Sequence, residues 1–235
     1  MDTYFNLKRI GYLLQADWIE HRKSLLLCLG GVSLVWIAIL YFAGPGDLAT
    51  NHQRNFFYVG GLVTFIYYCR FAGKKIHQPK GLYYTLPASN QEKYFTLLLE
   101  GVLFFLAFTV VFWVWLFLFK LLAPAFSVIT PSGLYDGVTP TVLLVFISSV
   151  ILLSHITFRK HATLIGFTGM ALYVLLFAGV ALKIVPAVID GSVADAAYLR
   201  KAFKFMMQLF TPVMLATSIV VLYIGYLKLK EKELR

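Results

Sequence analysis

Few ionisable side chains interrupt the long apolar stretches of this sequence, and those that do are the first candidates for chemistry. Glu100 lies inside one apolar run, Lys120 lies near the far end of the same run, and His155 lies at the end of another. Charged groups inside a membrane are costly and often mark ion or substrate pathways. Glu100 is therefore either a carboxylate on a transport path or one that reaches the membrane interface or pairs with a neighbouring lysine.

The residue patterns of catalysis and nucleotide binding are missing from the sequence. It contains no G-x-S-x-G elbow, no H-E-x-x-H zinc pair and no G-x-x-x-x-G-K-[ST] phosphate loop. Its two cysteines and five scattered histidines form no metal-binding motif. We therefore expect no catalytic residue, no metal ion and no directly bound cofactor, and a membrane-embedded enzyme is the weakest functional reading.

The segment 73–94, GKKIHQPKGLYYTLPASNQEKY, holds the most informative local pattern. Lysines flank a Pro-Lys-Gly turn and an aromatic patch, and Pro87 stops that element. Ser89 precedes Glu92 by three residues, which is the spacing of a helix capping box. A helix should thus begin near Asn90. The segment predicts either a surface that grips a cytoplasmic partner or a basic loop on anionic lipid.

Membrane-spanning helices must position these residues. The 235-residue chain is 60% hydrophobic and 14% charged, whereas a soluble domain is closer to half and a quarter. A spanning helix needs about 20 mostly apolar residues. Six stretches predict an all-α integral membrane protein with a single transmembrane domain over residues 1–235: roughly Leu25–Ala43, Gln53–Ala72, Phe95–Ala123, Pro140–Phe158, Ala162–Val185 and Phe205–Leu227.

The positive charges predict the orientation of the chain. The formal net charge of +10 is spread between apolar runs instead of forming one basic face, so we expect no nucleic-acid partner. Most lysines and arginines fall on the cytoplasmic side when the N-terminus is placed there. Both termini are then cytoplasmic.

Two flanking segments complete the predicted architecture. In residues 1–24, Leu7, Ile10, Leu14 and Trp18 share one helix face, which indicates an amphipathic helix on the membrane surface or against another subunit. Residues 186–204 should form an outer hairpin or loop that leads into the last span.

Taken in order, these features resemble the membrane (permease) subunit of a bacterial ABC exporter of the ABC-2 type. Such subunits have an N-terminal interfacial helix, six spans, a first cytoplasmic loop that couples to the ATPase, and often a short outer hairpin before the last span. The local cue is LPASNQEKY at residues 86–94. It is similar to the "LP-(A/V)-S-x-x-E" stretch that precedes the third span in many such permeases.

The resemblance implies a homo- or heterodimer of six-span subunits in the bacterial inner membrane, with lipid around it. It also implies separate P-loop ATPase subunits, which would bind ATP and Mg²⁺. Residues of the first cytoplasmic loop would contact that ATPase: Lys74, Lys75, His77, Leu82, Tyr83, Tyr84, Leu86, Pro87, Ser89 and Glu92. A non-transport anchor or assembly subunit of a larger complex is the alternative, and no sequence feature indicates a substrate.

Overall fold

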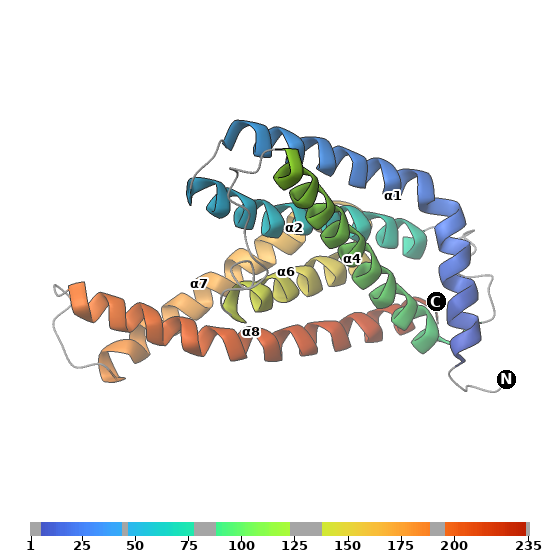
Figure 1. Cartoon of the computed structure of the whole chain (residues 1–235). Helices are drawn as coiled ribbons and strands as arrows, with labels where there is room; N and C mark the ends of the chain where they lie inside the picture. Colours follow the sequence, from blue (N-terminus) through green and yellow to red (C-terminus); the bar gives the residue numbers. More distant parts are fainter. Residues whose placement is uncertain (1–5, 44–46, 78–87, 123–137, 189–195, 234–235) are drawn as a thin grey trace. The chain divides into compact units, whose positions relative to one another are not determined.

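The computed structural model describes residues 6–43, 47–77, 88–122, 138–188 and 196–233. Within these ranges every regular element is an α-helix (Figure 1). The six helices are α1 (Leu7–Ala43), α2 (Asp47–His77), α4 (Asn90–Leu122), α6 (Val138–Thr157), α7 (Ala162–Val188) and α8 (Ala196–Glu233). The predicted all-α class is therefore confirmed for the described part of the chain.

Five of the described helices are long and apolar enough to cross a membrane. Their spanning stretches are Leu7–Phe42, His52–His77, Asn90–Leu122, Pro140–Thr157 and Gln208–Lys232. These stretches overlap five of the six predicted spans, so a multi-pass membrane protein is supported. The remaining predicted span, Ala162–Val185, falls in α7, where the described apolar stretch Ala162–Phe177 is shorter.

The first helix differs from the expected separate interfacial helix over residues 1–24. α1 runs without a break from Leu7 to Ala43, and Figure 1 shows it bending along its length. No proline lies between these residues, so nothing in the local sequence forces the helix to end. Ile10 is 3% exposed, whereas Leu7 and Trp18 of the predicted face are exposed.

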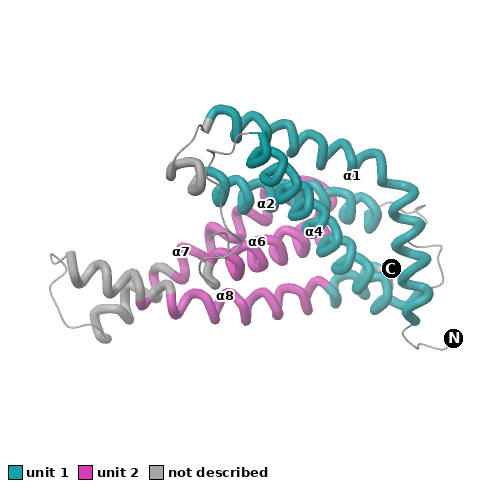
Figure 2. The backbone as a smooth tube through the Cα atoms, in the orientation of Figure 1, with its two compact units in different colours: residues 1–136, 226–235 teal, residues 137–225 magenta. Residues whose placement is uncertain are grey.

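The chain divides into two compact units (Figure 2). Unit 1 comprises Met1–Asp136 and Tyr226–Arg235 and contains α1, α2 and α4, while unit 2 comprises Gly137–Gly225 and contains α6 and α7. Helix α8 contributes residues to both units. A single transmembrane domain over residues 1–235 stays a prediction.

Aromatic rings fill the core of unit 1. Phe104, Phe108 and Phe112 recur every four residues of α4 and lie on its buried face. Trp36 of α1 stacks on Phe56 of α2 and on Phe112, with ring centroids 4.3 and 4.9 Å apart. These contacts join α1, α2 and α4 into one packed group of helices.

Close contact between α6 and α7 organises unit 2. Residues 158–161 connect the two helices, and His161 has a left-handed φ of 56° directly before α7 begins. A Cβ atom added at Gly166 would lie 2.9 Å from Ser154 Oγ and 3.6 Å from Ile151 Cα. The small residue at position 166 therefore allows the backbones to approach each other.

We predict that Gly166→Leu destabilises unit 2, whereas Gly169→Leu on the same helix does not. A leucine at 166 must push α6 and α7 apart, and overpacking of this kind costs about 1–3 kcal/mol. Nothing lies within 4 Å of a Cβ at Gly169. Thermal unfolding of the purified protein in detergent should show a lower Tm only for Gly166→Leu, and equal Tm values would contradict the packing described here.

Candidate functional site

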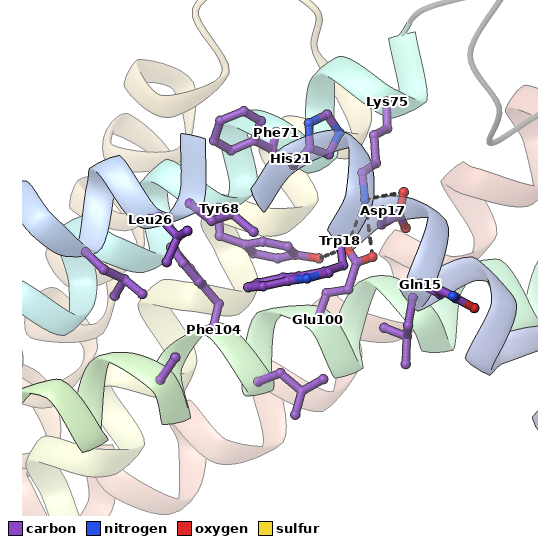
Figure 3. A pocket seen from close by; sticks show the side chains of 15 residues that line it. Gln15, Asp17, Trp18, His21, Leu26, Tyr68, Phe71, Lys75, Glu100 and Phe104 are labelled. Atoms are coloured by element: carbon purple, nitrogen blue, oxygen red, sulfur yellow. Dashed lines mark hydrogen bonds and ion pairs between the residues drawn. The ribbon is translucent and has the colours of Figure 1, made fainter. Parts of the chain in front are cut away.

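A buried ion-pair cluster joins the three helices of unit 1. The Lys75 Nζ atom lies 2.8 Å from Asp17 Oδ1 and 3.0 and 3.2 Å from the two carboxylate oxygens of Glu100. The side chains of Asp17, Lys75 and Glu100 are 16%, 7% and 12% exposed. These three residues, from α1, α2 and α4, form what we call the Lys75 cluster (Figure 3).

Local sequence features place the Lys75 cluster where the helices meet. Tyr68, two turns before Lys75 on α2, donates its hydroxyl hydrogen to the backbone carbonyl of Leu97 and lies 3.4 Å from Glu100 Oε2. Next to Glu100, a Cβ at Gly101 would approach the Tyr68 ring to 3.0 Å. The tyrosine therefore packs against α4 at a position where a larger residue would displace it.

The cluster contains more acidic groups than basic ones. It holds two carboxylate side chains and one ammonium group, all largely withdrawn from solvent. A buried charge is tolerated when partners and hydrogen bonds replace its lost hydration. One lysine satisfies that condition for its own charge, and the two carboxyl groups share it as their common cation.

A cavity of about 440 Å³ adjoins the Lys75 cluster (Figure 3). All three cluster residues line it, and aromatic and aliphatic side chains supply most of the remaining wall. The lining residues are Leu14, Gln15, Asp17, Trp18, His21, Leu25, Leu26, Leu29, Tyr68, Phe71, Lys75, Glu100, Leu103, Phe104 and Ala107. A cavity of this size with a few convergent polar groups has the properties of a small-molecule site.

A second polar contact fixes the start of α4. Ser89 N–H donates to Glu92 Oε2 at 2.8 Å, and Glu92 N–H donates to Ser89 Oγ at 3.3 Å. This reciprocal pair confirms the predicted capping box and the helix start at Asn90. Glu92 Oε1 accepts the Asn6 N–H at 2.7 Å, and Arg9 Nη1 lies 3.8 Å from Glu92 Oε2. We call this arrangement of Glu92, Ser89, Asn6 and Arg9 the Glu92 junction.

The structure separates the residues of the predicted ATPase contact. Lys74 is exposed, whereas Lys75 points into its cluster and Glu92 is completely buried. His77, at the end of α2, lies 3.2 Å from Lys232 Nζ at the end of α8. Ser89 belongs to the Glu92 junction, while Leu82, Tyr83, Tyr84, Leu86 and Pro87 lie outside the described residues, as does part of the predicted outer loop 186–204.

The other two ionisable candidates have different surroundings. Lys120 is exposed near the end of α4. His155 is 7% exposed and lies 3.0 Å from Thr163 Oγ1, across the turn between α6 and α7. Of the three ionisable residues first singled out, only Glu100 therefore lies in a charged cluster beside a cavity.

Sequence reasoning missed Asp17 and His21 as site residues. One potential metal-binding atom from each of the Asp17, Glu20 and His21 side chains lies within 4.8 Å of the other two, as the i, i+3, i+4 spacing on one helix would allow. Asp17 is already held by Lys75, and Glu20 is half exposed. That spacing was the available signal, but these residues look like an ordinary solvated helix face when the sequence is read alone.

Comparison of the chain with protein-family models finds no match, and neither does comparison with curated proteins or with solved structures.

Lys75→Met should destabilise unit 1. The substitution leaves the carboxylates of Asp17 and Glu100 facing each other without their common cation. Breaking a buried ion pair in this way costs about 3–5 kcal/mol. Thermal unfolding in detergent should show a clear loss of Tm, and Lys74→Met is the matched control because Lys74 is exposed on the same helix turn.

Neutralising the whole Lys75 cluster provides the complementary test. The triple variant Asp17→Asn, Lys75→Met and Glu100→Gln should recover much of the stability that Lys75→Met loses, because no unpaired charge remains. If the triple variant is no more stable than Lys75→Met, uncompensated charge is not the source of the loss.

Glu92→Ala should loosen the N-terminal ends of both α1 and α4. The substitution removes the acceptors of the Asn6 and Ser89 amide hydrogens, and each lost partner costs about 1–3 kcal/mol. Hydrogen–deuterium exchange should become faster in both helix starts. Exchange that rises only at Ser89, or that rises equally in the surface control Glu231→Ala, would show that Glu92 does not join the two helices.

Proposed function

We propose that this chain is the permease subunit of an ATP-driven exporter of the ABC-2 type, and that the segment between α2 and α4 receives the force. The observation that carries the proposal is the anchoring of the two helix ends that border this segment. The Lys75 cluster and the His77–Lys232 contact hold the end of α2. The Glu92 junction holds the start of α4.

Through these contacts, a displacement of the segment would be transmitted directly to the neighbouring helices. Movement of its first end would act on α1 and α4 through Asp17 and Glu100. Movement of its second end would act on α1 through Asn6. Packed helices and hydrogen-bonded networks with defined arrangements are the physical means by which coupling travels through a protein.

The C-terminal end of α8 is attached to the same region. Lys232 Nζ lies 3.2 Å from His77 Nδ1, and Tyr226 packs edge-on against Tyr94 with ring centroids 5.7 Å apart. Because α8 continues into unit 2, a force applied beside α2 and α4 reaches a helix that belongs to both units. A plain surface loop would have no such connection.

The remaining parts of the proposal follow from the resemblance at residues 86–94. Two six-span subunits, identical or related, would assemble in the bacterial inner membrane with both termini cytoplasmic, and α7 would supply the sixth span. A separate P-loop ATPase would bind ATP and Mg²⁺. Its closure would push on residues 77–92 and switch the permease dimer between inward-open and outward-open states.

The first test is affinity purification of the full chain from native membranes in mild detergent, followed by mass spectrometry. We expect a near-stoichiometric soluble protein that contains a Walker A sequence. If the dimer is recovered intact and no such protein accompanies it in repeated purifications, the anchor or assembly role replaces the exporter role.

In the purified complex, Lys74→Glu and the double variant Tyr83→Ala, Tyr84→Ala should lower stimulation of ATPase activity by the permease without preventing membrane insertion. Lys74 is chosen because its charge is exposed, whereas reversal at Lys75 would break a buried cluster. Lys160→Glu is the control, since it reverses an exposed charge in unit 2. Normal stimulation in correctly assembled Lys74 and tyrosine variants would refute this coupling surface.

A further inference from the structure

The cavity beside the Lys75 cluster is amphipathic along its length. Asp17, Lys75 and Glu100 supply its charged groups, and Leu29 and Ala107 line it about three and two helical turns further along α1 and α4. From Asp17 to Leu29 the lining follows α1 for roughly 18 Å at the helical rise of 1.5 Å per residue. The wall therefore matches a molecule with one polar head and an apolar tail.

The charge of the site selects the kind of head group. Lys75 is shared between two carboxylates, so an arriving anion would have to compete with both for the single ammonium group. An arriving amine could instead donate charge-assisted hydrogen bonds to the carboxyl oxygens of Asp17 and Glu100. Two carboxyl groups and one ammonium that is already paired thus favour a cationic head over an anionic one.

Aromatic side chains reinforce this selection. Trp18 and Tyr68 line the cavity together with Glu100, and Figure 3 shows their rings near the charged end. The faces of tryptophan and tyrosine rings attract ammonium groups, with the strongest effect where water is excluded. Trp18 is 53% exposed in the chain alone, so its ring can cover a ligand without leaving a packed position.

We propose that this cavity binds a membrane amphiphile with an amine head group, which Asp17 and Glu100 hold while the apolar tail lies along Leu25, Leu29, Phe104 and Ala107. Two sources can supply this chemistry: the amine head of a membrane phospholipid, or a freely diffusing single-chain amine. Binding of an amphiphile at this cavity is a property beyond the proposed exporter function.

Native mass spectrometry of the full chain in an uncharged detergent tests the proposal. The protein is incubated with phosphatidylethanolamine and phosphatidylglycerol of identical acyl chains, and separately with dodecylammonium and dodecyl sulfate. We expect at least one amine to bind about tenfold more tightly than its anionic counterpart, which corresponds to the loss of one charged hydrogen bond. Preference for the phospholipid identifies a lipid site, and preference for dodecylammonium alone identifies a site for free amphiphiles.

Two variants test the two ends of the cavity separately. Glu100→Gln removes one of the two carboxyl groups and leaves Asp17 paired with Lys75, so the preference for the amine should disappear. Ala107→Phe fills the apolar end and should weaken binding of the amine about tenfold without changing the cluster. Val110→Phe is the matched control, because Val110 is 61% exposed on the same helix and does not line the cavity.

The Tm of each variant is measured to confirm that the variant is folded. Amine preference in the wild type that is lost in Glu100→Gln and weakened in Ala107→Phe supports the site. Equal binding of amine and anion by the wild type overturns it. So does amine binding that both variants retain. Because the assay contains no ATPase, this result is independent of the test of the exporter function.

Discussion

The ammonium group of Lys75 can lie inside unit 1 only because carboxylates from two other helices surround it. That requirement constrains where α1, α2 and α4 meet, because removing either partner of a buried ion pair leaves an uncompensated charge. The hydrogen bond from Tyr68 to Leu97 and the adjoining cavity both lie beside this arrangement.

The Lys75 cluster and the Glu92 junction both link the helices at one end of unit 1, by different interactions. The cluster acts through charge at the end of α2, and the junction acts through backbone hydrogen bonds at the starts of α1 and α4. Both use a single side chain to satisfy groups from different helices. These two anchors lie at the helix ends that border residues 78–87, which is why the proposed coupling is placed there.

Features decided by neighbouring residues could be predicted from the sequence. The capping box of Ser89 and Glu92 and the helix start at Asn90 depend on a spacing of three residues, and the apolar stretches depend on local composition. The partners of Lys75 could not be predicted, because Asp17 and Glu100 are distant in sequence and each has an ordinary local context. The sequence predicts pairing with a neighbouring lysine as one alternative for Glu100. The identity of that lysine and of the second carboxylate depends on how three helices pack. The continuity of α1 was also missed, because the change from polar to apolar residues near Leu25 marks a change of surroundings and not a helix end.

The short connection between α6 and α7 limits how far these two helices can separate. A fully extended chain spans at most about 3.6 Å per residue, so residues 158–161 can add no more than about 14 Å between the helix ends. The end of α6 and the start of α7 must therefore remain neighbours in every conformation of the chain. Arg159 and Lys160 stay at this junction with them, so any motion within unit 2 carries two exposed positive charges along with the paired helix ends.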